Sequence, residues 1–357
     1  MKAFVTGATG LLGNNLVRAL RAEGHDVRAL VRSAEKARTY LGDTGAEIVQ
    51  GDMENVGAFA HGLEGCDVVF HTAAYFREYY SAGDHWPKLE AINVNGTLAL
   101  AQAARTHGVK RFIDVSSSGT IGRKPDGSPG DESTPPAPLA RDNLYLKSKV
   151  VVLEKLAPLA ERTGLDVVQV LPGWMFGPWD AAPTGAGQLV RDFLAGALPA
   201  IPPGGTSIAD ARDVAIGMIR AAERGRSGER YIMAGGFATL ADIIASLART
   251  TGTPGPRMRI PYAVAWTYAA VSQTWAKLTG GQTLVTLAGV RMMQARLAVD
   301  SRKAERELGF HARPLEETLR DTAAWYRAHE PQRAGAAEPQ SSFLEDSATR
   351  RKSTSHP

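Results

Sequence analysis

"TGATGLLG", residues Thr6 to Gly13, places a glycine at every third position between an apolar run and a helical pattern that begins directly after it. Gly7, Gly10 and Gly13 allow a tight turn, and a residue without a Cβ lets a diphosphate approach the backbone closely. The N-terminus of the following helix offers unpaired N–H groups and a partial positive charge to that anion. The spacing differs from the commonest fingerprint, G-x-G-x-x-G. The strand-turn-helix context nevertheless favours a dinucleotide site over a purely structural turn.

The first half of the chain alternates short apolar runs with helical patterns. The runs cover residues 2–7, 26–32, 46–52, 67–74, 111–118 and 165–173, and a further strand is expected at 228–236. Apolar strands that alternate with helices predict a parallel sheet covered on both faces. Connection rules favour the doubly wound arrangement. The expected fold class is therefore α/β, a Rossmann doubly wound parallel sheet with a smaller, mostly helical C-terminal substrate domain.

After Pro172 the regular alternation of apolar runs with helical patterns ends, and this change predicts the domain organisation. Residues 1–175 and 207–237 are expected to form the dinucleotide-binding domain, and residues 176–206 and 238–330 the substrate-binding domain. Residues 331–357 are polar and small, so they cannot bury enough apolar surface to order themselves. We expect them to form a disordered tail.

The composition is that of a chain able to bury a full core. It has 357 residues, 44% hydrophobic content and a net charge of only +4, with both signs mixed along the sequence, which argues against nucleic acid as a partner. The chain opens on a strand rather than on a leader, which predicts a cytoplasmic location. The longest apolar segment, Ile260 to Leu278, is interrupted by Ser272, Gln273 and Lys277. We interpret it as a helix of the second domain rather than a membrane span, with peripheral membrane contact as a minor alternative.

The end of the second apolar run bears on which dinucleotide is bound. An acidic residue there would hold the free ribose 2′-hydroxyl of NAD. This chain has Arg32 at that place and Lys36 close behind it. A cation suits a 2′-phosphate, so NADP(H) is preferred and NAD(H) is the alternative. A solvated arginine at a strand end would explain Arg32 without any cofactor.

"YLKSK", Tyr145 to Lys149, places a tyrosine and a lysine one helical turn apart on the same face. A free phenol has a pKa of ~10, too high for easy proton exchange near neutral pH. A neighbouring ammonium favours the phenolate and lowers that pKa. The pair on its own is common by chance, so its meaning depends on the surrounding motifs.

Those motifs follow one another in a fixed order over roughly residues 1–235. They are "TGATGLLG", "GDM" at 51–53, "HTAA" at 71–74, "NVNGT" at 93–97, "VSSSGTIG" at 115–122, "YLKSKVVVLE" at 145–154 and "LPGWMFGP" at 171–178. The set resembles the extended short-chain dehydrogenase/reductases, the NAD-dependent epimerase/dehydratase family. Within them the chain is most similar to the dihydroflavonol-reductase-like branch.

The resemblance implies a role for each matched residue. Tyr145 would be the proton donor and Lys149 its charge partner, and Ser117 would polarise the substrate oxygen, with Ser118 as the fallback. The implied cofactor contacts are Gly7, Thr9, Gly10, Leu11, Leu12, Gly13, Arg32, Lys36, Asp52, Met53, Thr72, Ala73, Ala74, Asn93, Lys149, Pro172 and Gly173. A packing or capping role is the alternative for Asn93. No metal is expected, and the resemblance implies a homodimer.

Aromatic residues follow two of the expected strands and predict the substrate side. Tyr75, Phe76, Tyr79, Tyr80 and Trp86 would line one wall, and Trp174, Met175, Phe176 and Trp179 the other, with Ser118 near the reacting group. Apolar walls suit a small lipophilic or aromatic carbonyl compound. The sequence thus favours an NADPH-dependent reductase of a ketone or aldehyde. The alternatives are a nucleotide-sugar 4-epimerase with tightly bound NAD and a non-catalytic dinucleotide sensor.

Overall fold

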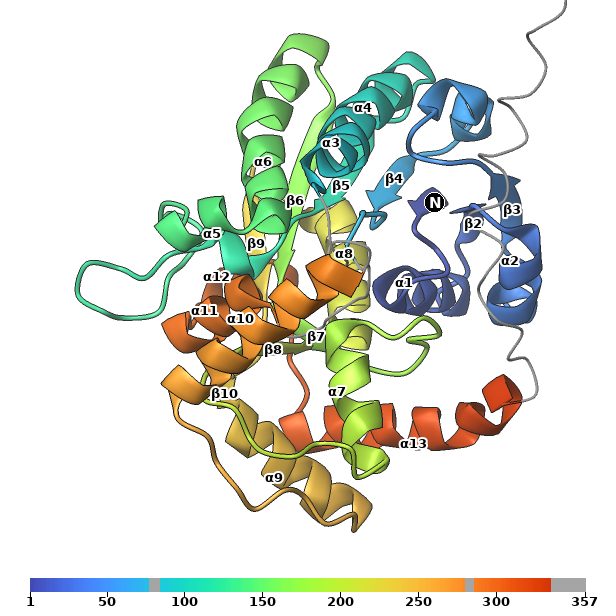
Figure 1. Cartoon of the computed structure of the whole chain (residues 1–357). Coiled ribbons are helices and arrows are strands. Elements are labelled where there is room, and N and C mark those ends of the chain that lie inside the picture. The colour runs from blue at the N-terminus through green and yellow to red at the C-terminus, as the bar shows by residue number, and fades with distance from the viewer. Residues whose placement is uncertain (77–83, 280–285, 335–357) are drawn as a thin grey trace, which may run out of the picture.

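The computed structural model describes residues 1–76, 84–279 and 286–334 (Figure 1). A seven-stranded sheet forms its centre, and every pairing in that sheet is parallel. In spatial order its strands are β3 (Glu47–Gln50), β2 (Asp26–Val31), β1 (Lys2–Thr6), β4 (Val68–His71), β5 (Arg111–Val115), β6 (Asp166–Pro172) and β9 (Arg230–Met233). The strand order runs outward in both directions from β1 and β4, which confirms the doubly wound arrangement.

Both faces of the sheet are covered by helices, which explains why its central strands are mostly apolar. Ala3 and Val5 of β1 point to the face covered by α1 (Leu11–Ala22) and α8 (Ala211–Arg224), whereas Phe4 points to the opposite face. That opposite face carries α4 (Thr97–Thr106) and α6 (Leu144–Thr163). Shorter helices complete this half: α2 (Ala34–Leu41), α3 (Trp86–Leu89), α5 (Pro138–Asp142) and α12 (Arg302–Leu308).

A second, three-stranded sheet was not expected from the sequence. It consists of β10 (Phe237–Thr239), β8 (Gly205–Asp210) and β7 (Trp174–Phe176), and α7 (Gly185–Leu194), α9 (Leu240–Thr251) and α13 (Leu315–Ala334) share a core with it. The predicted domain boundaries after residues 175, 206 and 237 each cut one of these strands. The two halves of the molecule are therefore joined through this sheet, whose short strands carry too little pattern to be recognised.

The C-terminal region is helical, as the sequence predicts. It comprises α9, α10 (Tyr262–Thr279), α11 (Leu287–Ala295), α12 and α13. Helix α13 continues to Ala334, so the first residues of the predicted tail are helical, and the rest of that tail lies outside the described residues. None of the helices in the described ranges is long and apolar enough to cross a membrane.

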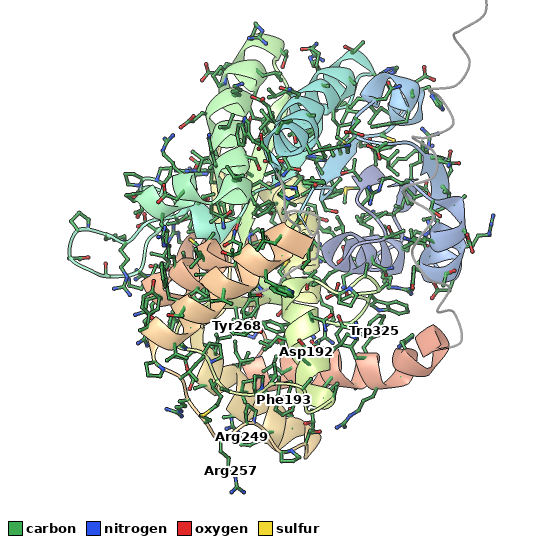
Figure 2. The ribbon with its side chains drawn as sticks, viewed as in Figure 1. Asp192, Phe193, Arg249, Arg257, Tyr268 and Trp325 are labelled. Atoms are coloured by element: carbon green, nitrogen blue, oxygen red, sulfur yellow. The ribbon has the colours of Figure 1, made fainter. Side chains whose placement is uncertain are left out.

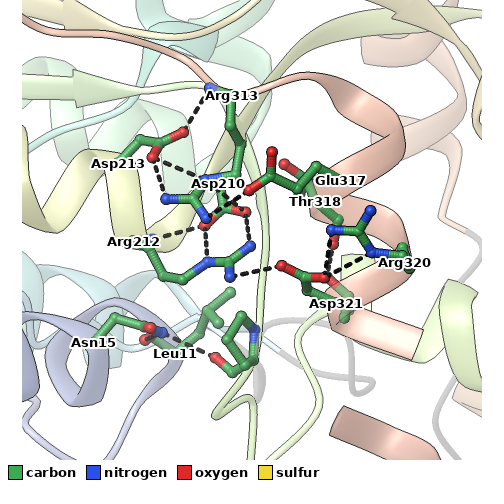
Figure 3. A network of polar contacts seen from close by, with 12 residues as sticks. Leu11, Asn15, Asp210, Arg212, Asp213, Arg313, Glu317, Thr318, Arg320 and Asp321 are labelled. Atoms are coloured by element: carbon green, nitrogen blue, oxygen red, sulfur yellow. Dashed lines mark hydrogen bonds and ion pairs between the residues drawn. The ribbon is translucent and has the colours of Figure 1, made fainter. Parts of the chain in front are cut away.

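A network of charged side chains joins the C-terminal helix α13 and the residues just before it to β8 and α8 (Figure 3). Arg212, at the start of α8, bridges Asp210 at the end of β8 and Asp321 in α13, each at 2.8 Å. Arg313 pairs with Asp213 of α8 at 2.6 Å. Burial opposes the charge of Arg212, but the hydrogen bonds and attraction of Asp210 and Asp321 outweigh it and raise the pKa of Arg212. The network therefore holds together segments that are far apart in the chain.

Candidate active site

The glycine turn between β1 and α1 is closed so tightly that side chains are excluded at two positions. Gly7 has a φ of +67°, and a Cβ there would lie 2.7 Å from the backbone nitrogen of Ala73. A Cβ at Gly13 would lie 2.2 Å from the carbonyl oxygen of Gly7. The first turn of α1 carries no acidic residue that would compete for its N–H groups. This cradle suits a diphosphate, as the sequence predicts.

We expect Gly13→Ala to destabilise the protein by about 1–3 kcal/mol, because the new methyl group must displace backbone rather than a side chain. Urea unfolding measures this change. Binding of the dinucleotide should weaken at least about 10-fold, since the turn that receives the diphosphate shifts. Gly236→Ala is the matched control, because a Cβ at Gly236 meets nothing within 4 Å. Equal effects of the two substitutions would contradict the role given to Gly13.

The turn opens into a cavity of about 460 Å³ that lies at the carboxyl ends of the parallel strands. The predicted cofactor residues that line it are Gly7, Thr9, Gly10, Leu11, Leu12, Gly13, Arg32, Asp52, Met53, Thr72, Ala73, Ala74, Lys149, Pro172 and Gly173. Ser117, Ser118, Tyr145, Tyr75, Phe76 and Trp174 line it as well. The structure therefore brings together nearly all of the side chains that the sequence singled out.

Five of the predicted residues that the structure describes do not line the cavity: Lys36, Trp86, Asn93, Phe176 and Trp179. Lys36 is exposed on α2, one turn beyond Arg32. Phe176 is only 1% exposed and packs with Val190 and Phe193 in the core beneath the small sheet. Asn93 is buried in a π-helical segment, Glu90–Gly96, that joins α3 to α4. For Asn93 the structure supports the packing alternative: its amide group hydrogen-bonds both the N–H and the carbonyl of Tyr75 and also bonds Ser148 Oγ.

Helix α6 presents the tyrosine and the lysine to the cavity. Asn143 caps the helix, since its side chain accepts a hydrogen bond from the backbone of Leu146, and Tyr145 lies in the first turn. The half-buried Tyr145 ring meets Phe76 edge-on at 4.7 Å between centroids. Lys149 Nζ lies 5.9 Å from the centre of the Tyr145 ring. The pair therefore shares one face of α6 and one cavity.

Lys149 is the most strongly desolvated cation of the site. Its ammonium donates a 2.7 Å hydrogen bond to the carbonyl of Val115, and only 4% of the residue is exposed. Burial lowers the pKa of Lys149, whereas the attraction of Asp114 opposes that shift. An ammonium has two further N–H groups to offer a ligand.

The buried His71 behind this lysine has a structural role. Burial and the charge of Lys149 lower the pKa of His71 to about 3, so its imidazole is neutral near pH 7. The ring contacts the hydroxyl groups of Thr6 and Thr97 at 2.8 and 2.9 Å. It thereby links β4 to β1 and α4.

The serines after β5 differ in their surroundings. Ser117 is half-buried, and its Oγ accepts a 3.2 Å hydrogen bond from the backbone of Gly119. Ser118 is 6% exposed and begins a short 3-10 turn, Ser118–Thr120. Ser116 Oγ is buried without a hydrogen-bond partner among the described residues, although Ser116 also lines the cavity. The assignment of Ser117 as the catalytic serine stays a prediction.

The lining of the cavity also contains residues that the sequence did not identify. Asn143, Thr184, Thr206, Met292, Met293 and Leu297 belong to it. The adjacent methionines of α11 were the available signal, because flexible thioether side chains are frequent at adaptable apolar sites. Of the other candidates for the substrate walls, Met175 lines the cavity, whereas Trp179 packs against Trp325. Trp86 lies outside the lining, and its ring centroid is 4.2 Å from Lys147 Nζ. Tyr79 and Tyr80 lie outside the described residues.

Comparison with known proteins adds to this geometry. The family described as "NAD dependent epimerase/dehydratase family" matches residues 3–234. A Synechocystis protein named "Putative dihydroflavonol 4-reductase" is 34% identical, over 91% of this chain and 94% of its own length. "Sterol demethylase protein B" of Methylococcus capsulatus is 33% identical, over 92% and 98%. The crystal structure of a nucleoside-diphosphate-sugar epimerase from Pseudomonas aeruginosa superimposes with a TM-score of 0.73 at 29% identity, over 92% of this chain and 98% of that chain.

Proposed function

Because the chain belongs to the NAD-dependent epimerase/dehydratase family, as an NAD(P)-dependent enzyme of the extended short-chain dehydrogenase/reductase type, we propose that it is an NADPH-dependent reductase. Its substrate would be the ketone or aldehyde of a small lipophilic or aromatic compound. The observation that carries this proposal is the cavity itself, which Tyr145, Lys149, the glycine turn and Arg32 share with the apolar side chains of Met292, Met293 and Leu297. The preference for NADP(H), the homodimer and the cytoplasmic location are parts of the proposal that rest on the sequence.

The side chains present fit such a cofactor and the reaction. The glycine turn would receive the diphosphate, Arg32 the 2′-phosphate and the free N–H groups of Lys149 the ribose hydroxyls. A bound dihydronicotinamide supplies a hydride to the carbonyl carbon. Ser117 donates a hydrogen bond to the carbonyl oxygen, and Tyr145 gives that oxygen its proton. The nearby ammonium of Lys149 stabilises the phenolate that remains.

The substrate side of the cavity favours an apolar compound. Phe76, Trp174 and Met292 supply apolar surface there, and among the described lining residues the only cations are Arg32 and Lys149. The names of the two relatives, a reductase of a flavonoid and a protein of sterol demethylation, fit ring systems of that character.

The second candidate is a nucleotide-sugar 4-epimerase, which the similarity to the Pseudomonas aeruginosa enzyme favours. A sugar nucleotide would need cations at the substrate end to bind its own diphosphate. Two arginines that could serve this purpose are Arg191 in α7 and Arg212 at the start of α8. Neither lines the cavity, and Arg212 is engaged by Asp210 and Asp321. The site therefore supports the reductase better.

The test identifies the nucleotide that the purified protein carries. The protein is denatured, the released nucleotide is identified by mass spectrometry, and the apo form is titrated with NADPH and NADH. Reversible binding that prefers NADPH supports a reductase. Tightly retained NAD would point to an epimerase that regenerates its cofactor and would overturn the proposal.

We expect Arg32→Ala to raise the Kd for NADPH at least about 10-fold, because charge-assisted hydrogen bonds to a phosphate contribute about 1.5–3 kcal/mol. The Kd for NADH should change little. Arg38→Ala is the matched control, since Arg38 is exposed on α2, the helix that follows Arg32, and does not line the cavity. If both cofactors weaken equally in Arg32→Ala, Arg32 does not read the 2′-phosphate.

A further inference from the structure

Helix α10 is built the opposite way from an ordinary surface helix. The residues that it buries against the protein are small: Ala265, Ala269 and Ala276 are at most 5% exposed. Its large apolar side chains point outward, and they are Val264, Tyr268, Val271, Trp275 and Leu278, which we call the α10 stripe. Each member of the stripe is between 50% and 79% exposed. A globular protein normally turns such side chains inward, so a contiguous exposed stripe marks a contact surface.

The spacing of the stripe shows that it is one continuous ridge. Its members follow one another at intervals of four and three residues, so they lie along a single side of the helix. Met258 and Trp266, 59% and 39% exposed, add apolar surface near the start of α10. The helix lies across the outside of the molecule, in front in Figure 1.

The segment of the chain that contains α10 is cationic. From residue 243 to residue 299 the chain contains no Asp or Glu, and its cations are Arg249, Arg257, Arg259, Lys277, Arg291 and Arg296. This segment is more positive than the whole chain, whose net charge is +4. Arg257, Arg259 and Arg291 are exposed, and no ion pair within the described residues involves them. Figure 2 shows the Arg257 side chain at the edge of the molecule, pointing away from the ribbon.

Helix α10 also lies beside a helix that lines the cavity. The backbone N–H of Leu287, the first residue of α11, lies 3.4 Å from the side-chain oxygen of Gln273 in α10. Met292 and Met293 of α11 line the cavity. The exposed apolar helix is therefore one helix away from the apolar wall of the site.

We propose that α10 is a membrane-contact helix that docks the protein on an anionic bilayer surface. The α10 stripe enters the boundary between headgroups and acyl chains, and Arg257, Arg259 and Arg291 contact lipid phosphates. Tryptophan and tyrosine suit this boundary because each has an apolar ring and a polar edge. Basic side chains beside an apolar stripe add electrostatic attraction to anionic lipids. This docking does not depend on which reaction the cavity performs.

A second copy of the chain fits the stripe less well. A two-fold symmetric interface places the same patch of each copy against the other. Here the arginines around the stripe would approach each other without any acidic residue of the segment to compensate them, and like charges across an interface oppose binding. An anionic bilayer supplies the missing negative charge.

The test measures flotation of the full-length protein with vesicles of phosphatidylcholine alone and of phosphatidylcholine with phosphatidylserine. We expect binding to the anionic vesicles that weakens with salt. Tyr268→Ser combined with Trp275→Ser should reduce the partition coefficient at least about 10-fold. Arg257→Gln and Arg259→Gln should each reduce it about 5-fold on anionic vesicles only. Ile216→Ser is the matched control, because Ile216 is a 43%-exposed apolar residue of α8 outside the stripe.

Near-UV circular dichroism checks that the stripe variants stay folded, and sedimentation velocity reports their oligomeric state. The proposal is overturned if the wild-type protein does not bind anionic vesicles at low salt. It is also overturned if a stripe variant binds them as strongly as the wild type. A dimer that dissociates in the stripe variant, without vesicle binding by the wild type, would assign the stripe to a second copy instead.

Discussion

Tyr145→Phe is expected to lower kcat by a factor of about 100 to 10,000, the range that a positioned proton donor contributes. The substitution removes one oxygen from a half-buried ring and leaves its edge-on contact with Phe76 in place. The cofactor cradle around Gly7 and Gly13 is untouched, so the Kd for the dinucleotide should stay within about 3-fold, less than 1 kcal/mol. Steady-state assays with a lipophilic ketone panel and a binding titration measure the two quantities separately.

Two further variants make this result interpretable. Tyr75→Phe is the matched control, because Tyr75 also lines the cavity while its hydroxyl contacts His85 at 3.1 Å. Its kcat should remain within about 3-fold of wild type. Lys149→Met should lower both kcat and cofactor affinity, since the ammonium is expected to serve the phenol and the ribose. A Tyr145→Phe enzyme that turns over like Tyr75→Phe would show that the proton comes from elsewhere.

The sequence predicts those parts of the site that depend on local pattern. Continuous apolar strands suffice for the doubly wound parallel sheet, and the glycine turn marks where a diphosphate is expected. The interval between Tyr145 and Lys149 suffices to place both on one helical face. These features involve neighbours in the chain, and the structure confirms the arrangement.

The features that the sequence did not predict depend on contacts between distant segments. Trp174 and Phe176 are two residues apart on β7, so their side chains lie on the same side of the strand, with ring centroids 4.9 Å apart. Only Trp174 reaches the cavity, because Phe176 packs against α7. Met292 and Met293 enter the site from a helix more than a hundred residues beyond Tyr145. No periodicity reveals which of two equivalent side chains a remote helix will cover.

The charged network around Asp210 is expected to be the most sensitive point for stability. Asp210→Asn should lower the free energy of unfolding by about 3 kcal/mol, because removing one partner leaves partly buried charges uncompensated. The Asp210 carboxylate is fully buried and lies 2.8 Å from Arg212 and 3.5 Å from Arg313. Asparagine keeps the cap on α8, where Asp210 accepts from the backbone of Arg212, so the loss reports the charge. Asp210→Ala removes the cap as well and should cost about 1 kcal/mol more.

The exposed pair of Arg249 and Glu316 provides the control for this prediction. It has a shorter separation, 2.6 Å, but both side chains are more than half exposed. Solvent screening makes such pairs weak, so Glu316→Gln should change the free energy of unfolding by at most about 0.5 kcal/mol. Urea unfolding of the three variants compares them directly. Because Arg212 and Arg313 link β8 and α8 to the segment of α13, loss of the network should also release α13, which hydrogen exchange detects as lost amide protection there. If Asp210→Asn were as stable as Glu316→Gln, solvent rather than the Asp210 carboxylate would compensate the charges of Arg212 and Arg313.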